Sequence, residues 1–88
     1  MKLNKSLNMS CRDGDLDGVV KAIKEGADIN NKDGALSRSP LIFVAEFSQN
    51  IEIIKNLISK NADINYKDDK NDSALSCLVR SNNVEGVK

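Results

Sequence analysis

The stretch Gly-Ala-Asp-Ile-Asn at residues 26–30 returns as Asn-Ala-Asp-Ile-Asn at residues 61–65, 35 residues further along the chain. Each copy follows an amphipathic stretch, in which apolar residues recur with the spacing of one helix face. Because the flanks match as well as the five residues themselves, the pattern indicates a repeated structural unit. The apolar residues of the two amphipathic stretches are Leu16, Val19, Val20 and Ile23 in the first and Ile51, Ile54, Leu57 and Ile58 in the second.

Each unit also contains a shorter apolar segment, which precedes the amphipathic stretch. These segments lie at residues 7–11 and 41–45, and a third copy opens at residues 75–79. Gly26 and Asn61 suit the left-handed conformation that closes a helix. The sequence therefore predicts a unit of helix, tight turn, helix and extended polar loop.

The unit resembles the ankyrin repeat, which has about 33 residues. The Thr-Pro-Leu-His opening of that family is similar to Ser-Pro-Leu-Ile at residues 39–42 and to Ser-Ala-Leu-Ser at residues 73–76. Its Gly-Ala-Asp-Val-Asn ending is similar to the two stretches quoted above. The resemblance implies an all-α ankyrin-repeat solenoid, in which stacked antiparallel helix pairs are joined by extended loops and β-turns. It divides residues 1–88 into an N-terminal capping repeat at 1–32, a second repeat at 33–67 and a partial third repeat at 68–88.

Three departures from the family pattern lead to expectations of their own. The family histidine is replaced by Asn8, Ile42 and Ser76, so we expect the hydrogen bonds that it makes to neighbouring loops to be absent. The second unit is one residue longer in its loop, at 34–38, and in its inter-helix turn, at 48–50. The third unit is truncated in the middle of its second helix, and we expect self-association through the open C-terminal end.

The composition argues against nucleic acid and membranes as partners. Thirteen Lys and Arg residues balance thirteen Asp and Glu residues, the charges are interspersed, and only three aromatic side chains are available to stack on bases. No stretch approaches the roughly 20 apolar residues of a membrane span, and the N-terminus lacks the apolar middle of a signal peptide. We therefore expect a cytoplasmic protein.

The residue types also argue against catalysis and metal binding. The chain has no histidine, which is the usual general base at neutral pH and the commonest metal ligand. Its two cysteines, Cys11 and Cys77, lie two repeats apart in the ankyrin register, beyond the ~7 Å reach of a disulfide, and are predicted to be small core residues. We expect no enzymatic activity, no cofactor and no metal.

A calcium site at residues 13–18 is an alternative. The sequence Asp-Gly-Asp-Leu-Asp-Gly matches the first six positions of an EF-hand loop. The twelfth position of that loop requires a glutamate with two coordinating oxygens, and here it is Lys24. The ankyrin register accounts for the same residues without a metal.

The resemblance implies a protein–protein interaction module, whose partner lies on the concave face formed by the loop tips and the exposed side of each first helix. Arg12, Glu46 and Arg80 take equivalent places on successive units, so a charge ladder is expected. Phe47 is either an exposed contact beside an arginine or is turned into the core by the extra turn residue. Tyr66 either staples the loop or contacts the partner. The candidate residues are Arg12, Asp13, Lys32, Arg38, Glu46, Phe47, Tyr66, Lys67, Asp69, Lys70, Arg80 and Ser81.

Two other interpretations stay open. The chain is alternatively a structural segment of a larger ankyrin protein without a partner of its own, or a regulatory segment attached to an enzyme. Further repeats beyond residue 88 would favour the former, and a non-repeat domain would favour the latter.

Overall fold

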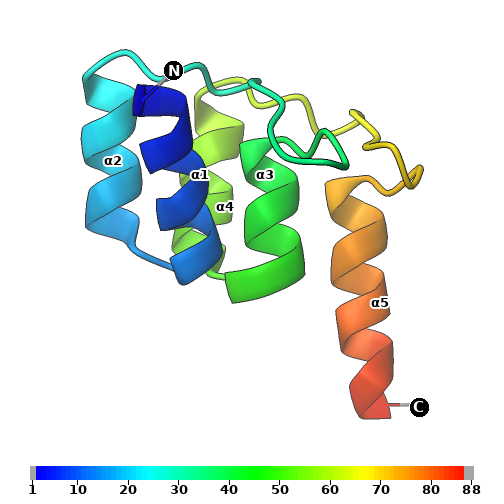
Figure 1. Ribbon diagram of the computed structural model, residues 1–88. Coiled ribbons are helices and arrows are strands. Elements are labelled where there is room, and N and C mark those ends of the chain that lie inside the picture. The colour runs from blue at the N-terminus through cyan, green and yellow to red at the C-terminus, as the bar shows by residue number, and fades with distance from the viewer. Residues whose placement is uncertain (1, 87–88) are drawn as a thin grey trace.

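The structure is a computed structural model that describes residues 2–86, with side chains described for residues 2–80. Over these residues the chain is helical and contains no β-strand, apart from one isolated bridge between Asp33 and Arg38. The elements are α1 (Lys2–Asp13), α2 (Leu16–Lys24), α3 (Pro40–Phe43) with the π-helical turn η1 (Val44–Ser48) directly after it, α4 (Ile51–Ser59) and α5 (Ala74–Gly86) (Figure 1).

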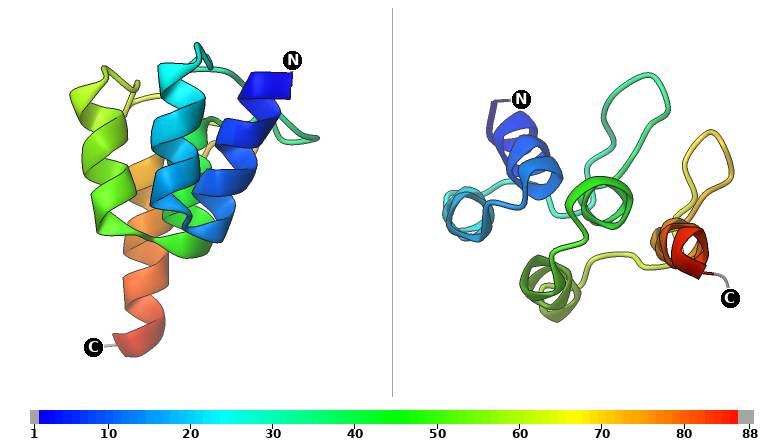
Figure 2. Two further views of the ribbon diagram at one scale, coloured as in Figure 1. Left: turned by 90° about the vertical axis from the view of Figure 1, so that its left-hand side faces the viewer. Right: turned by 90° about the horizontal axis from the view of Figure 1, so that it is seen from below.

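The helices stand in two rows. α1, α3 and α5 form one row, and α2 and α4 form a second row behind it, as the view from below in Figure 2 shows. α1 and α2 run antiparallel, as do α3 and α4, and the loops between the pairs project on the side of the first row. The predicted all-α stack of antiparallel helix pairs is therefore confirmed.

The core lies between the two rows and repeats with the units. Leu7 and Leu41 hold equivalent places on the first helices, and Val19 and Ile53 are the first buried residues of the two second helices. All four side chains are buried. The remaining buried apolar side chains are Cys11, Ala22, Ala27, Ile42, Val44, Ala45, Leu57, Ala74 and Cys77.

Local chemistry explains where the helices begin. The Ser39 hydroxyl accepts a hydrogen bond from the Ile42 amide at 3.4 Å, and Pro40 follows at the first helical position. The Asp15 carboxylate caps α2 by accepting from the Gly18 amide at 3.0 Å. Ser73 has the same role for α5, since its hydroxyl accepts from the Ser76 amide at 3.2 Å.

The two copies of the quoted motif end one helix and then bridge to the next unit. Gly26 and Asn61 adopt the predicted left-handed conformation, with φ of 108° and 71°. The Asp28 and Asp63 carboxylates accept from the backbone amide two residues further on, at 2.9 and 3.0 Å. Asn30 then reaches into the following unit, where its side-chain oxygen accepts from the Asp63 amide at 2.8 Å. The motif is therefore structural in both copies.

The extra residue in the second inter-helix turn widens the end of the first helix into η1. The Gln49 amide donates to the Val44 carbonyl at 2.6 Å, and Gln49 itself is left-handed, with φ of 54°. A π-helical turn absorbs one inserted residue without losing the helical hydrogen bonds. Ser48 and Asn50 then tie this turn to the first unit, because their side chains donate to the Cys11 and Gly14 carbonyls at 2.7 and 3.2 Å.

The expectation that all three replacements of the family histidine lose their loop hydrogen bonds is wrong at Asn8. Asn8 is buried, and its amide nitrogen donates to the side-chain oxygens of Asn31 at 2.8 Å and Asp33 at 3.2 Å. An asparagine amide carries both donors and an acceptor, so it can bond to the loop as a polar ring does. Ile42 is also buried, and its apolar side chain makes no hydrogen bond to a loop.

The third unit differs from the expected one in its last residues. We expected a turn and a second helix there, but α5 continues as one helix to Gly86. A turn within this segment would leave backbone amides without helical partners. Continuing α5 keeps the backbone amides bonded instead. Val87 and Lys88, where we placed the middle of that second helix, lie outside the described residues.

We expect Leu57→Ala to lower the free energy of unfolding by about 2–5 kcal/mol, because it leaves a cavity at a fully buried position. Ile51→Ala is the matched control: it lies on the same helix but is exposed, and should cost less than about 1 kcal/mol. Urea unfolding followed by circular dichroism measures both changes. A loss below about 1 kcal/mol for Leu57→Ala would contradict the core assignment.

Candidate partner-binding surface

The first loop tip is a rigid hairpin between the first two units. Asp33 and Arg38 exchange backbone hydrogen bonds at 2.9 and 3.0 Å, and Gly34 and Ser37 adopt left-handed conformations at its bend. The Asp33 carboxylate also accepts from the Gly34 amide at 2.8 Å. The extra residue predicted at 34–38 lies within this hairpin, so the insertion extends the tip without disturbing the helices.

The second loop tip is folded around the buried carboxylate of Asp68. One oxygen of this carboxylate accepts from the backbone amides of Lys70 at 2.9 Å and Asp72 at 3.0 Å. The Asp68 amide donates to the Asp72 carbonyl at 2.9 Å, which closes the loop. The exposed residues Lys67, Asp69 and Lys70 surround the tip.

Contacts between the two loop tips hold them together. The Asp69 amide donates to the Leu36 carbonyl at 2.9 Å, and the Tyr66 hydroxyl donates to the Ser37 carbonyl. The Lys32 ammonium lies 4.8 Å from the centre of the Tyr66 ring. Partial burial and then the nearby carboxylates Asp69 and Asp68 raise the pKa of Tyr66. Of the two roles considered for Tyr66, the structure shows the loop staple.

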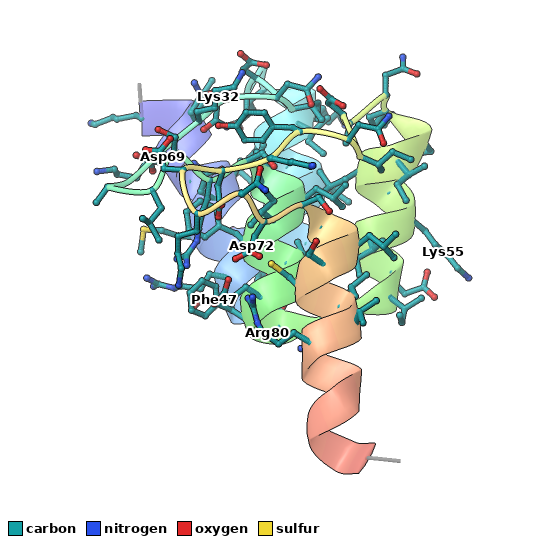
Figure 3. The ribbon with its side chains drawn as sticks, turned by 90° about the vertical axis from the view of Figure 1, so that its right-hand side faces the viewer. Lys32, Phe47, Lys55, Asp69, Asp72 and Arg80 are labelled. Carbon is teal, nitrogen blue, oxygen red and sulfur yellow. The ribbon has the colours of Figure 1, made fainter. Side chains whose placement is uncertain are left out.

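Phe47 lies on the surface, and the residue is 48% exposed. It stacks on Phe43, with ring centres 6.2 Å apart, and the Arg38 guanidinium covers it at 5.5 Å from the ring centre. Figure 3 shows Phe47 on the same side of the molecule as Asp72 and Arg80, close to the end of η1. The extra turn residue therefore leaves Phe47 exposed beside an arginine, and its contact with a partner stays a prediction.

The predicted charge ladder forms between the second and third units only. Glu46 lies 3.6 Å from Arg80, and Arg80 also pairs with Asp72 at 3.2 Å. Arg12 does not take part, because it pairs with its neighbour Asp13 at 3.3 Å. A residue of the hairpin faces Glu46 in place of Arg12. It could not be found by comparing equivalent positions on the first helices, because it lies in a loop.

That residue is Arg38, whose side chain is mostly buried. Its guanidinium lies 3.4 Å from the Glu46 carboxylate and 3.7 Å from the second oxygen of the Asp68 carboxylate. The Asp68 side chain has no exposed surface, and this second oxygen has no hydrogen-bond partner. Arg38 is therefore the charge that compensates a buried carboxylate, and it also covers the Phe47 ring.

The sequence analysis missed a hollow between α1 and the hairpin. The hollow has a volume of about 290 Å³, and half-exposed Met9 and partly buried Phe43 supply its apolar lining. Lys5, Met9 and Arg12 are spaced so that they lie on one face of a helix. This spacing could have indicated from the sequence that the three side chains line a common surface. The other lining residues are Asn8, Asp33 and Gly34.

A second hollow, of about 300 Å³, lies beside α5 at the C-terminal end of the stack. Its surface is mostly apolar and comes from α3, η1, α4, α5 and the loop before α5. The apolar lining includes Leu41, Ala45, Ile54, Ile58 and Leu78. Leu75 borders it and is 66% exposed. Ser81, the last candidate residue, is on α5, and its side chain lies outside the described part of the chain.

The residues considered for metal and thiol chemistry have structural contacts. Asp15 caps α2 and Asp13 pairs with Arg12. In residues 2–80 no three His, Cys, Asp or Glu side chains converge as they would to hold a metal ion. Cys11 and Cys77 are free and buried, and burial raises the pKa of Cys11 to about 12. Burial, and next the Glu46 charge, raise the pKa of Cys77 to about 11.

Comparison with known proteins adds one match. A family model described as ankyrin repeats (3 copies) matches residues 7–88, from within α1 to the end of the chain. No curated protein matches the sequence. No helix within residues 2–86 combines the length and apolar character that crossing a bilayer requires.

We expect Arg38→Met to lower the free energy of unfolding by about 3 kcal/mol, because it leaves the buried Asp68 carboxylate uncompensated. Arg12→Met is the matched control, since it breaks an exposed ion pair and should cost less than about 1 kcal/mol. Thermal and urea unfolding measure both changes. Equal, small losses for the two variants would show that the Arg38–Asp68 pair does not hold the loop.

Proposed function

The chain belongs to the ankyrin-repeat family, and from that premise we propose that it binds another protein through the concave face formed by its two loop tips and helices α1, α3 and α5. Ankyrin repeats are generally protein-interaction modules and are typically non-catalytic. Stacked repeats present extended concave surfaces of this kind. The proposed contacts are the candidate residues of the loop tips and first helices, with Phe47 at their centre.

The observation that carries the proposal is the exposed ring of Phe47. A large aromatic side chain in water gains free energy when a partner covers it, and aromatic and arginine side chains are enriched among binding hot spots. Phe43 and Arg38 hold this ring on two sides. Little conformational freedom is therefore lost when a partner binds, which favours affinity.

The rigidity of the loop tips supports the same surface. Each tip is closed by its own backbone hydrogen bonds, and the Asp69 amide and Tyr66 hydroxyl join one tip to the other. Arg80, Asp72 and Glu46 form a charged border beside Phe47. A surface with a fixed apolar centre and a polar rim has the anatomy of a protein–protein interface.

The side chains also support a module with no catalysis of its own. The sequence has no histidine to act as a base at neutral pH. Both thiols are buried, and their raised pKa values of about 12 and about 11 keep them protonated near neutral pH, whereas the thiolate is the nucleophilic form. A regulatory role beside a catalytic domain elsewhere in a longer chain is compatible with this reading.

A second candidate function rests on the apolar hollow at the C-terminal end. Leu41 and Leu75 hold equivalent places in successive units, but Leu41 is 2% exposed and Leu75 is 66% exposed. Such a face is stabilised when another apolar helix covers it, either a further repeat of a longer chain or a second copy of this one. For the chain of 88 residues by itself, we propose self-association through this hollow.

Affinity capture from cell lysate with immobilised wild-type and Phe47→Ala chains tests the first function. We expect proteins retained by the wild type to lose affinity by about 30-fold or more on Phe47→Ala, since hot-spot truncations cost about 2 kcal/mol or more. Ile51→Ala removes an exposed apolar side chain from α4, in the second row of helices, and should leave capture unchanged. The same proteins retained by all three chains would contradict the proposed surface.

Sedimentation velocity over a range of concentrations tests self-association. We expect the wild-type chain to gain mass with concentration and Leu75→Asp to remain monomeric, because a charge on this face opposes its burial. Val20→Asp adds the same charge at an exposed position on α2 and should associate as the wild type does. A wild-type chain that is monomeric at every concentration would remove this candidate.

A further inference from the structure

Helix α1 carries a cationic face at the edge of the surface proposed to bind a partner, of which α1 is a part. Its residues 2–12 include Lys2, Lys5 and Arg12 and no acidic residue. Met9 lies four residues after Lys5 and three before Arg12, so the side chains of Lys5, Met9 and Arg12 share one face of the helix. Lys5 is exposed and forms no ion pair within the described part of the chain. Arg12 pairs with Asp13, but both side chains are exposed, so this pair neutralises the charge of the face only weakly.

This face borders the hollow of about 290 Å³ between α1 and the hairpin. Met9, which is 48% exposed, and Phe43 form its apolar lining, and the stacked Phe47 ring extends the apolar surface outward. A methionine side chain adapts its shape to what it contacts. The volume is near the lower end of ligand pockets, ~300 Å³, which suits a large side chain rather than a whole ligand molecule.

Asp33 is the one acidic residue that lines the hollow, and hydrogen bonds to Gly34 and Asn8 hold both of its carboxylate oxygens. Asp33 accepts from the Gly34 amide with one carboxylate oxygen, at 2.8 Å, and from the Asn8 amide nitrogen with the other, at 3.2 Å. Asp33 belongs to the hairpin, whereas Lys5 and Arg12 belong to the helix across the hollow. No ion pair links Asp33 to either cation among the described residues. The helix side of the hollow is therefore cationic.

We propose that the occupant of this hollow is a protein segment in which a large apolar side chain is flanked by acidic residues. The apolar side chain lies between Met9 and Phe43 and against Phe47, and the acidic residues face Lys5 and Arg12. This inference rests on the proposed function and narrows it, because like charges would repel a basic segment from the same place. The apolar lining favours a protein segment over a nucleic acid, whose phosphates would find few cations here.

Selection of a random peptide library displayed on phage against the folded chain tests the inference. The enriched peptides are expected to combine Asp or Glu with a neighbouring Leu, Met or aromatic residue. Synthetic copies of them are then titrated against the wild type and its variants by fluorescence anisotropy. No enrichment, or enrichment of basic or uncharged peptides, overturns the proposal.

The variants separate the charge from the apolar contact. We expect Lys5→Glu/Arg12→Glu to weaken binding of the acidic peptides by about tenfold or more, and added salt to weaken wild-type binding. Lys55→Glu/Lys60→Glu makes the same change of net charge on and after α4, where Figure 3 shows Lys55 far from Phe47, and should change affinity by less than about twofold.

The failures of the two proposals are distinguishable. Binding that is lost with Phe47→Ala but unaffected by Lys5→Glu/Arg12→Glu overturns the acidic partner and leaves the concave surface standing. Binding that neither variant weakens overturns both. Circular dichroism melts of all variants show that they are folded, and equal weakening by the two double-charge variants overturns the local role of Lys5 and Arg12.

Discussion

The structure depends on the covering of each unit's apolar face by the next unit. A single helix pair is too small to bury its own apolar side chains, so a repeat is stable only within a stack. Leu41 is covered and only 2% exposed, because α5 packs beside α3 and η1, although the rest of that unit's face borders the apolar hollow. Leu75 holds the same place one unit later and stays exposed. The interior of the stack and its open end therefore follow from one requirement.

Polar side chains fix the register in which the units stack. The Asn8 amide nitrogen of the first unit donates to the Asp33 carboxylate of the second at 3.2 Å, and the Asn30 side-chain oxygen accepts from the Asp63 amide at 2.8 Å. These bonds lie on the loop side, and the Ser48 bond to the Cys11 carbonyl joins the units at the opposite ends of their helices. Because both ends are held, the loop tips and first helices keep a constant spacing, and the concave surface has a defined shape.

The sequence was sufficient for those features that repeat or are local. The apolar spacing and the left-handed Gly26 depend only on neighbouring residues, and both were predicted. Features that depend on contacts between residues far apart in the sequence were not predicted. Arg38 reaches Glu46 and Asp68 from the first loop tip, and Asn8 bonds to partners 23 and 25 residues away. The side on which Phe47 lies depended on how the helix absorbed its extra residue, which spacing alone did not determine.

The candidate surface thus combines an apolar centre, Phe47, with charges placed by different elements. Hydrogen–deuterium exchange of the chain, alone and with a bound protein or peptide, tests this surface most directly, because it locates the bound segment without any mutation. We predict slower exchange in α1, the hairpin at 33–38 and η1, with α2 and α4 unchanged. Protection confined to the apolar hollow between α4 and α5 would contradict the concave surface and place the partner at the open end of the stack.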